Sequence, residues 1–145
     1  MAAGVFVAGQ SVDPDLADLM RQTEYRLNTA FAADIEGTQF KKVEIKLTND
    51  GFFRYRRTFL NGKQEYFSFH FSQFEDLEYL GTTHLGFLVM KTKPESIIVQ
   101  TFRDSKGNID TMATELRVPL KDMDVADIQA FQMCFSKIHE KLKQP

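Results

Sequence analysis

Residues 43–71 read VEIKLTNDGFFRYRRTFLNGKQEYFSFHF, and apolar and polar side chains alternate through most of this stretch. A period of two residues is typical of a strand that has one face in the core and the other in water. The turn sequences Asn49-Asp50-Gly51 and Leu60-Asn61-Gly62 interrupt the alternation. The stretch therefore predicts three antiparallel strands joined by two short hairpin loops.

The lengths of these two loops determine which residues face each other. A three-residue loop at 49–51 places Leu47 opposite Phe53, and a three-residue loop at 60–62 places Phe53 opposite Phe69. The more common two-residue turn at Asn61-Gly62 would separate the apolar residues of the two strands, so we favour the three-residue loop. The predicted core face then comprises Phe53, Tyr55, Phe59, Phe67, Phe69 and Phe71. The predicted outward residues are Tyr66, Ser68, His70 and Ser72.

Two helices flank the predicted strands. Asp13-Pro14-Asp15 is typical of a helix start, and apolar residues spaced by three and four predict a helix over residues 14–32. The same spacing, from Val125 to Leu142, predicts an amphipathic helix over residues 124–143 with Asp122 or Asp124 as its cap. Its apolar face must pack on the sheet.

Further strands are predicted at residues 87–90, 97–103 and 109–118. Residues 72–81 have two possible assignments. Ser72 and Glu75 form a capping-box pattern that favours two helical turns, and a short strand or bend is the alternative. The whole predicts an α+β fold: an antiparallel meander sheet or a partly closed barrel of about six or seven strands, with an N-terminal helix and a C-terminal amphipathic helix.

Composition limits the classes of protein. The chain has 145 residues, of which 26% are charged and 43% hydrophobic, as expected for one core-forming domain, which we place at residues 13–145. A net charge of −2 argues against nucleic acid as a partner. Residues 1–12 are read either as a flexible N-terminus of a cytoplasmic protein or as the remnant of a signal peptide, which would make the protein extracytoplasmic (periplasmic or secreted).

The order of elements over residues 40–143 resembles that of pleckstrin-homology-like domains, in which a final helix caps a curved sheet. The spacing Lys46-x7-Arg54-x-Arg56 is similar to the basic signature of the members that bind phosphoinositides. The resemblance implies a binding domain. If residues 72–81 are helical, the order looks more like that of small acidic secretion chaperones, which dimerise; a lipocalin-like barrel is a third alternative.

The candidate ligand-binding residues lie on the predicted outward face: Lys46, Arg54, Arg56, Tyr66 and His70. Clustered cations suit a phosphate or an anionic membrane, whereas alternating charges are also the normal outer surface of a one-sided sheet. We predict a non-catalytic domain that recognises a protein or peptide. Binding of anionic lipid or phosphate, a chaperone-like dimer and an enzyme without a local motif remain alternatives.

Other chemistry has little support in the sequence. His70, His84 and His139 lie in different elements, and Cys134 lies beside the apolar stripe of the last helix. No metal site, cofactor or catalytic residue is predicted, because the spacings that build such sites are missing from the sequence. A pocket lined by Phe53, Phe67 and Phe69 under the last helix would instead indicate a small apolar ligand.

Overall fold

The structure, a computed structural model, describes residues 14–34 and 37–143. Residues 1–12 and the predicted cap Asp13 lie outside this range. The elements are α2 (Pro14–Ala30), β1 (Phe40–Leu47), β2 (Phe52–Phe59), β3 (Gln64–His70), the 3-10 turn η1 (Phe71–Gln73), β4 (Phe74–Gly81), β5 (Leu85–Thr92), β6 (Ile97–Phe102), β7 (Asp110–Ala113), β8 (Glu115–Lys121) and α3 (Val125–Leu142). The α+β class is confirmed. No helix in the described ranges is long and apolar enough to cross a membrane.

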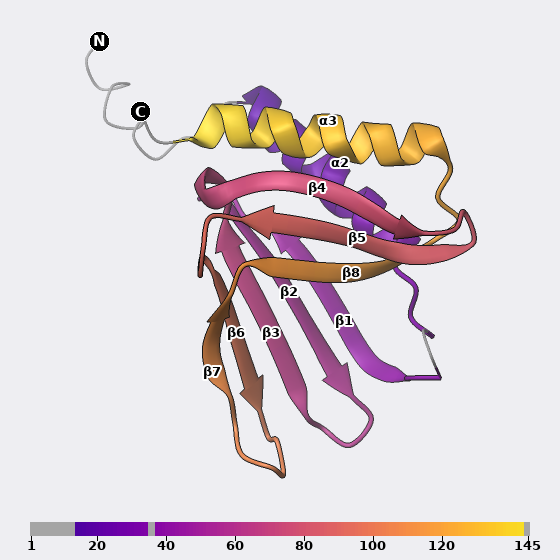
Figure 1. Ribbon diagram of the computed structural model, residues 1–145, viewed down its shortest axis with the longest axis vertical. Coiled ribbons are helices and arrows are strands. Elements are labelled where there is room, and N and C mark those ends of the chain that lie inside the picture. Colours follow the sequence, from indigo (N-terminus) through magenta and orange to yellow (C-terminus); the bar gives the residue numbers. More distant parts are fainter. Residues whose placement is uncertain (1–13, 35–36, 144–145) are drawn as a thin grey trace.

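The eight strands of the described chain form two antiparallel sheets. One sheet has the order β1-β2-β3-β6-β7 and the other the order β4-β5-β8. Figure 1 shows β4, β5 and β8 running across the upper ends of the steeply inclined β1, β2 and β3. The predicted meander therefore applies only to β1–β3, since the chain changes sheets three times. The sheets are not closed into a barrel.

The predicted register of the first three strands is confirmed. Leu47 lies opposite Phe53, and Phe53 lies opposite Phe69, so both hairpin loops have three residues. Gly51 and Gly62 have φ angles of 94° and 92°, the left-handed conformation in which such loops usually place glycine. Apolar side chains of the three strands consequently share one face, called here the inner face.

Residues 74–81 form strand β4, and residues 72 and 73 belong to the 3-10 turn η1, so the alternative of two α-helical turns over 72–81 is wrong. A register irregularity between Phe74 and Asp76 inserts one extra residue into β4, which brings Phe74 and Leu77 onto the same buried face. A β-bulge thus reproduces the spacing of three that a helix would have.

Two other predicted boundaries are wrong. Residues 109–118 are not one strand, because the chain leaves the larger sheet after β7 and enters the smaller one at β8. The backbone N–H of Thr92 donates to the carbonyl oxygen of Thr114 at this crossing (3.0 Å). The first helix ends at Ala30 rather than at residue 32, since Phe31 forms a β-bridge with Leu120.

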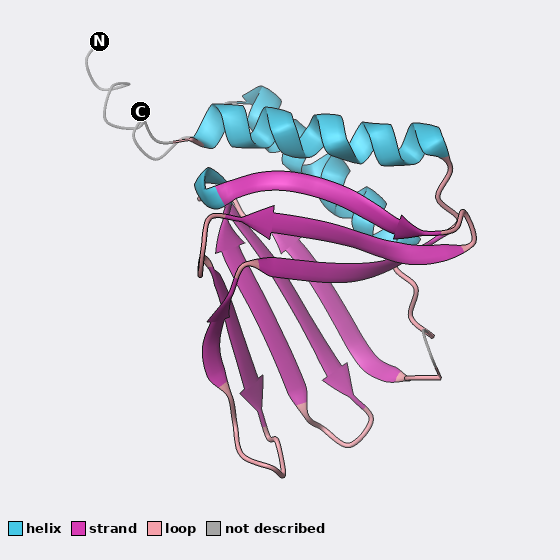
Figure 2. Ribbon diagram, in the orientation of Figure 1, coloured by secondary structure: helices cyan, strands magenta, loops and turns pink. Residues whose placement is uncertain are grey.

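Both helices pack on the inner side of the sheets (Figure 2). Phe135 of α3 is fully buried, and its ring centroid lies 6.2 Å from that of Phe53 and 5.4 Å from that of Phe71. Asp124 caps α3 by accepting a hydrogen bond from the backbone N–H of Asp127 (2.9 Å). Of the three residues predicted to line a pocket under the last helix, Phe53 and Phe69 are buried and Phe67 is half-buried, and Phe135 of α3 packs beside Phe53.

Candidate functional site

The outer face of the five-stranded sheet carries the predicted basic residues. Strand pairing aligns one row of residues across all five strands: Lys46, Arg54, Ser68, Ile98 and Met112. The next row comprises Glu44, Arg56, Tyr66, Gln100 and Asp110. Neighbouring strands lie about 4.8 Å apart, so each row spans roughly 19 Å.

The cationic end of this face is formed by Lys46, Arg54 and Arg56. All three residues are exposed, and none of them forms an ion pair with a carboxylate in the described part of the chain. Glu44 lies opposite Arg56, as the register predicts, but it pairs with Lys42 instead (3.4 Å). The guanidinium groups of Arg54 and Arg56 are therefore open to an anionic group from outside.

Aromatic rings support the two arginines. The guanidinium carbon of Arg54 lies 5.3 Å from the ring centroid of Phe52, and that of Arg56 lies 5.1 Å from that of Tyr66. Contacts of a cation with a ring face stabilise the cation without neutralising it. The structure thus brings Tyr66 together with Arg56 on the face that the sequence indicates.

His70 also lies on the outer face, but its ring binds the neighbouring backbone. The N–H of Ser72 donates to Nδ1 (3.1 Å), which leaves Nε2 to donate to the carbonyl oxygen of Asp50 (2.9 Å). Phe52 packs edge-on against the ring, with 4.9 Å between the centroids. His70 therefore links the end of β3 to the β1–β2 loop, and both of its nitrogens are already engaged.

Two serines predicted to point into solvent are buried. Ser68 lies between Arg54 and Ile98 in its row, and only 3% of its surface is exposed because its side chain is shorter than those of its neighbours. Ser72 belongs to η1, where its Oγ lies 2.7 Å from Nδ1 of His70.

The other end of the outer face is apolar, which the sequence analysis missed. Ile98, Phe102 and Met112 are 37%, 40% and 45% exposed, a large fraction for apolar side chains gathered on two adjacent strands. The signal was present in the run Ile97-Ile98-Val99, because three successive apolar residues leave one on the outer face of a strand.

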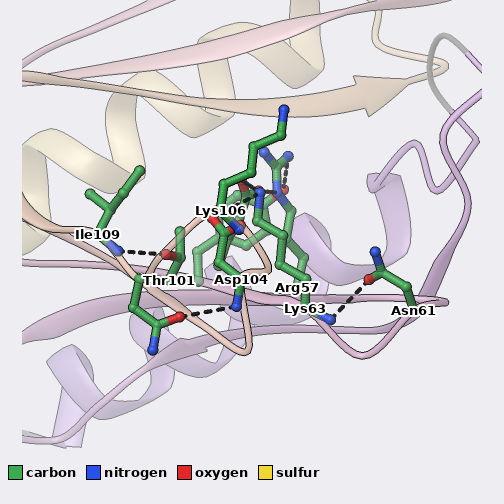
Figure 3. A network of polar contacts seen from close by, with 10 residues as sticks. Arg57, Asn61, Lys63, Thr101, Asp104, Lys106 and Ile109 are labelled. Carbon is green, nitrogen blue, oxygen red and sulfur yellow. Dashed lines mark hydrogen bonds and ion pairs between the residues drawn. The ribbon is translucent and has the colours of Figure 1, made fainter.

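A second polar cluster lies on the inner face at the lower end of the larger sheet (Figure 3). Arg57 donates through Nε to Glu65 (2.6 Å) and through Nη1 to the hydroxyl of Tyr55 (3.3 Å). Lys63 lies 3.8 Å from Glu65 and 3.6 Å from Asp104, which ties the β2–β3 loop to the β6–β7 loop. The predicted register already placed Arg57 opposite Glu65, so this ion pair could have been predicted.

The pKa values in this cluster are shifted by burial and by the charges of the cluster itself. Burial raises the pKa of the Tyr55 hydroxyl. Burial disfavours the Arg57 cation, but Tyr55 and Glu65 outweigh that effect and raise its pKa. A hydrogen bond from the backbone N–H of Lys106, together with the charge of Lys63, lowers the pKa of Asp104. Each charge has an internal partner, so the cluster stabilises the sheet and leaves little capacity for a ligand.

The other histidines and Cys134 lie apart from one another and do not form a common site. His139 Nδ1 hydrogen-bonds to the carbonyl oxygen of Phe71 (2.8 Å), His84 is exposed, and Cys134 is half-buried on α3. In residues 14–34 and 37–143 no group of three or more His, Cys, Asp or Glu residues could hold a metal ion.

Comparison with protein-family models, curated proteins and solved structures found no match to this chain. The outer face of the larger sheet therefore provides the basis for a functional proposal.

Proposed function

We propose that the protein is a non-catalytic binding domain that receives a protein or peptide on the outer face of its five-stranded sheet. The observation that supports this proposal is the row that joins Lys46 and Arg54 to Ile98 and Met112 across the sheet. The row has cations at one end and exposed apolar side chains at the other. A partner with acidic groups near one end of its contact surface and apolar groups near the other is complementary to it.

The packing of α3 supports recognition at the surface rather than in a pocket. Phe53 and Phe69 are 0% and 1% exposed and are stacked against each other, with 5.2 Å between their ring centroids. Their close packing leaves little room for a small apolar ligand between the sheet and α3. The resemblance to pleckstrin-homology-like domains stays a prediction and is consistent with a binding role.

An anionic membrane is the second candidate partner, because Arg54 and Arg56 have no carboxylate partner. Glu44 and Asp110 on the same face oppose this alternative, since both would be brought against anionic headgroups. A bound peptide contacts fewer side chains than a membrane surface does. It can therefore lie along the row from Lys46 to Met112, which contains no carboxylate. We therefore favour the peptide or protein partner.

The test compares three forms of the protein isolated from its natural host under native conditions: wild type, the double variant Arg54→Glu/Arg56→Glu, and Arg26→Glu. Arg26 is exposed on α2, away from the outer face, and controls for the change in charge. We expect a partner that copurifies with wild type and Arg26→Glu and is lost from the double variant. Equal recovery of partners by all three forms would contradict the proposal.

A vesicle assay distinguishes membrane binding from binding of a protein or peptide. We expect no sedimentation of wild-type protein with phosphatidylserine vesicles, even at low salt, where charge attraction is strongest. Sedimentation that disappears in the double variant would instead identify the basic residues as a lipid-binding surface.

A further inference from the structure

A separate hollow lies at the lower end of the outer face, two residues along the strands from Glu44, Arg56 and Tyr66. It has a volume of about 340 Å³ and is lined by Lys41, Lys42, Thr58, Gly62, Gln64 and Arg103. We propose that this hollow is a binding site for a phosphate or sulfate group. The site is independent of the proposed partner-binding row, since Lys46, Arg54 and Arg56 do not line it.

An irregular backbone places two of the cations. Phe40 lies opposite Phe59, and Lys42 lies opposite Thr58, so Lys41 is an extra residue in β1. A bulge of this kind redirects side chains and is frequent beside binding sites. Regular alternation would have put Lys41 on the inner face, whereas the bulge brings it to the hollow together with Lys42.

The third cation also comes from an unusual conformation. Arg103 has a φ of 56°, which is uncommon for a residue with a long side chain and costs free energy. A Cβ atom added to Gly62 would lie 3.9 Å from Nη1 of Arg103, so the guanidinium group lies beside the β2–β3 turn. Two irregular segments that are distant in the sequence thus direct cations into one hollow.

The charges of the hollow are available for an anion. No ion pair in the described residues involves Lys41 or Arg103, and Lys42 pairs only with the half-buried Glu44 (3.4 Å). The neighbouring Asp104 is engaged by Lys63 and by the backbone N–H of Lys106. Lys41, Lys42 and Arg103, counted with the Glu44 carboxylate beside Lys42, give a net charge of +2, while the charge of Asp104 is balanced by Lys63. A net charge of +2 matches a dianion.

The donors favour a tetrahedral oxyanion over a carboxylate. Besides the ammonium and guanidinium groups, the lining offers the hydroxyl of Thr58 and the amide of Gln64. A phosphate or sulfate group presents three or more oxygens to such surrounding donors, whereas a carboxylate presents two. The volume lies at the lower end of the range for small-ligand sites, so the ligand is a free ion or a small ester.

Titration with inorganic phosphate, followed by the backbone amide resonances of Gly62, Gln64 and Arg103, tests the proposal. Sodium acetate at equal ionic strength is the control anion. We expect saturable shifts with phosphate in the millimolar range and no saturation with acetate. Absence of saturation with phosphate, or equal behaviour of the two anions, would overturn the proposal.

Substitution of a residue that lines the hollow tests whether phosphate binds there. Arg103→Asn removes the cation, and asparagine tolerates a positive φ, so we expect a folded protein whose thermal midpoint is unchanged or raised. Its phosphate affinity should fall at least about tenfold, the effect of losing one charge-assisted hydrogen bond. Arg26→Gln on α2 should leave the affinity unchanged. Unchanged affinity in Arg103→Asn, or an equal loss in both variants, would refute the site.

One further titration and one vesicle assay identify the molecule that carries the phosphate group. Tighter binding of glycerol 3-phosphate than of inorganic phosphate would identify a soluble phosphate ester. Sedimentation with phosphatidic acid vesicles that requires Arg103 would identify a lipid headgroup, and binding of inorganic phosphate alone would identify the free ion. Since these assays involve no protein partner, their outcome is separate from that of the proposed partner-binding function.

Discussion

Phe135 is the position at which the packing of α3 is most open to a quantitative test. Its side chain is fully buried, and its ring centroid lies 5.4 Å from Phe71, 5.5 Å from Phe74 and 6.2 Å from Phe53. Truncation of a buried Phe to Ala costs about 3–5 kcal/mol in total, and aromatic contacts, worth about 0.5–1.5 kcal/mol each, place a Phe surrounded by rings in the upper part of that range. Because three rings surround it, we expect Phe135→Ala to lower the free energy of unfolding by about 4–5 kcal/mol.

Equilibrium unfolding in urea measures this change through the midpoint and slope of the transition. Met133→Ala is the matched control, because Met133 lies on the same helix and is 59% exposed. The control should change stability by less than about 0.5 kcal/mol. A loss below about 1 kcal/mol for Phe135→Ala would show that α3 does not pack on the sheet as described, and that its apolar face is available to a partner.

Three further substitutions test the local structure. Gly51→Ala should destabilise by about 1–3 kcal/mol, since the position has a φ of 94° and a Cβ atom would lie 2.6 Å from Nε2 of His70; chemical denaturation measures it. Arg57→Met should cost about 1–3 kcal/mol by leaving Glu65 with only its more distant partner, and adding Glu65→Gln should restore part of that loss in the same assay. The hydroxyl of Thr48 donates to Asp50 and lowers its pKa below the ordinary value of 3.8, so the carboxylate stabilises the fold above that pH and loses this effect as the pH falls through the lowered value. Asp50→Asn should therefore flatten the acid limb of a stability–pH profile, and an unchanged acid limb would contradict the assigned hydrogen bond.

Local patterns predicted the parts of the fold that depend on near neighbours in the chain. The register between Leu47 and Phe53 follows from the length of one loop, and α3 follows from its apolar spacing. Asp124 proved to be the cap of α3, one of the two that the sequence allowed.

The errors came from contacts between distant segments. The bulge at residues 74–76 imitates helical spacing, and its identity as a strand depends on pairing with β5. The division at Thr114 depends on β7 pairing with β6 and β8 with β5, and residues 109–118 contain no Gly or Pro to mark it.

The candidate site was predicted in part. Alternation placed Lys46, Arg54 and Arg56 on one face, and the structure brings them together there. Ile98 and Met112 join that face only because β6 pairs with β3, some thirty residues away in the sequence. The run Ile97-Ile98-Val99 indicated an outward apolar residue, but its place in the row of Lys46 and Arg54 depends on strand pairing, as does the bulge at Lys41.

Site-specific photo-crosslinking in the natural host tests the central claim, which is that the outer face of the five-stranded sheet binds a partner. Benzoylphenylalanine replaces Tyr66 on this face in one form of the protein and Tyr25 in another. Tyr25 is 73% exposed on α2, so a reactive group there is at least as accessible to chance collisions. We expect a discrete crosslinked protein from position 66 and none from position 25, whereas equal adducts from both positions, or adducts from position 25 alone, would contradict the claim.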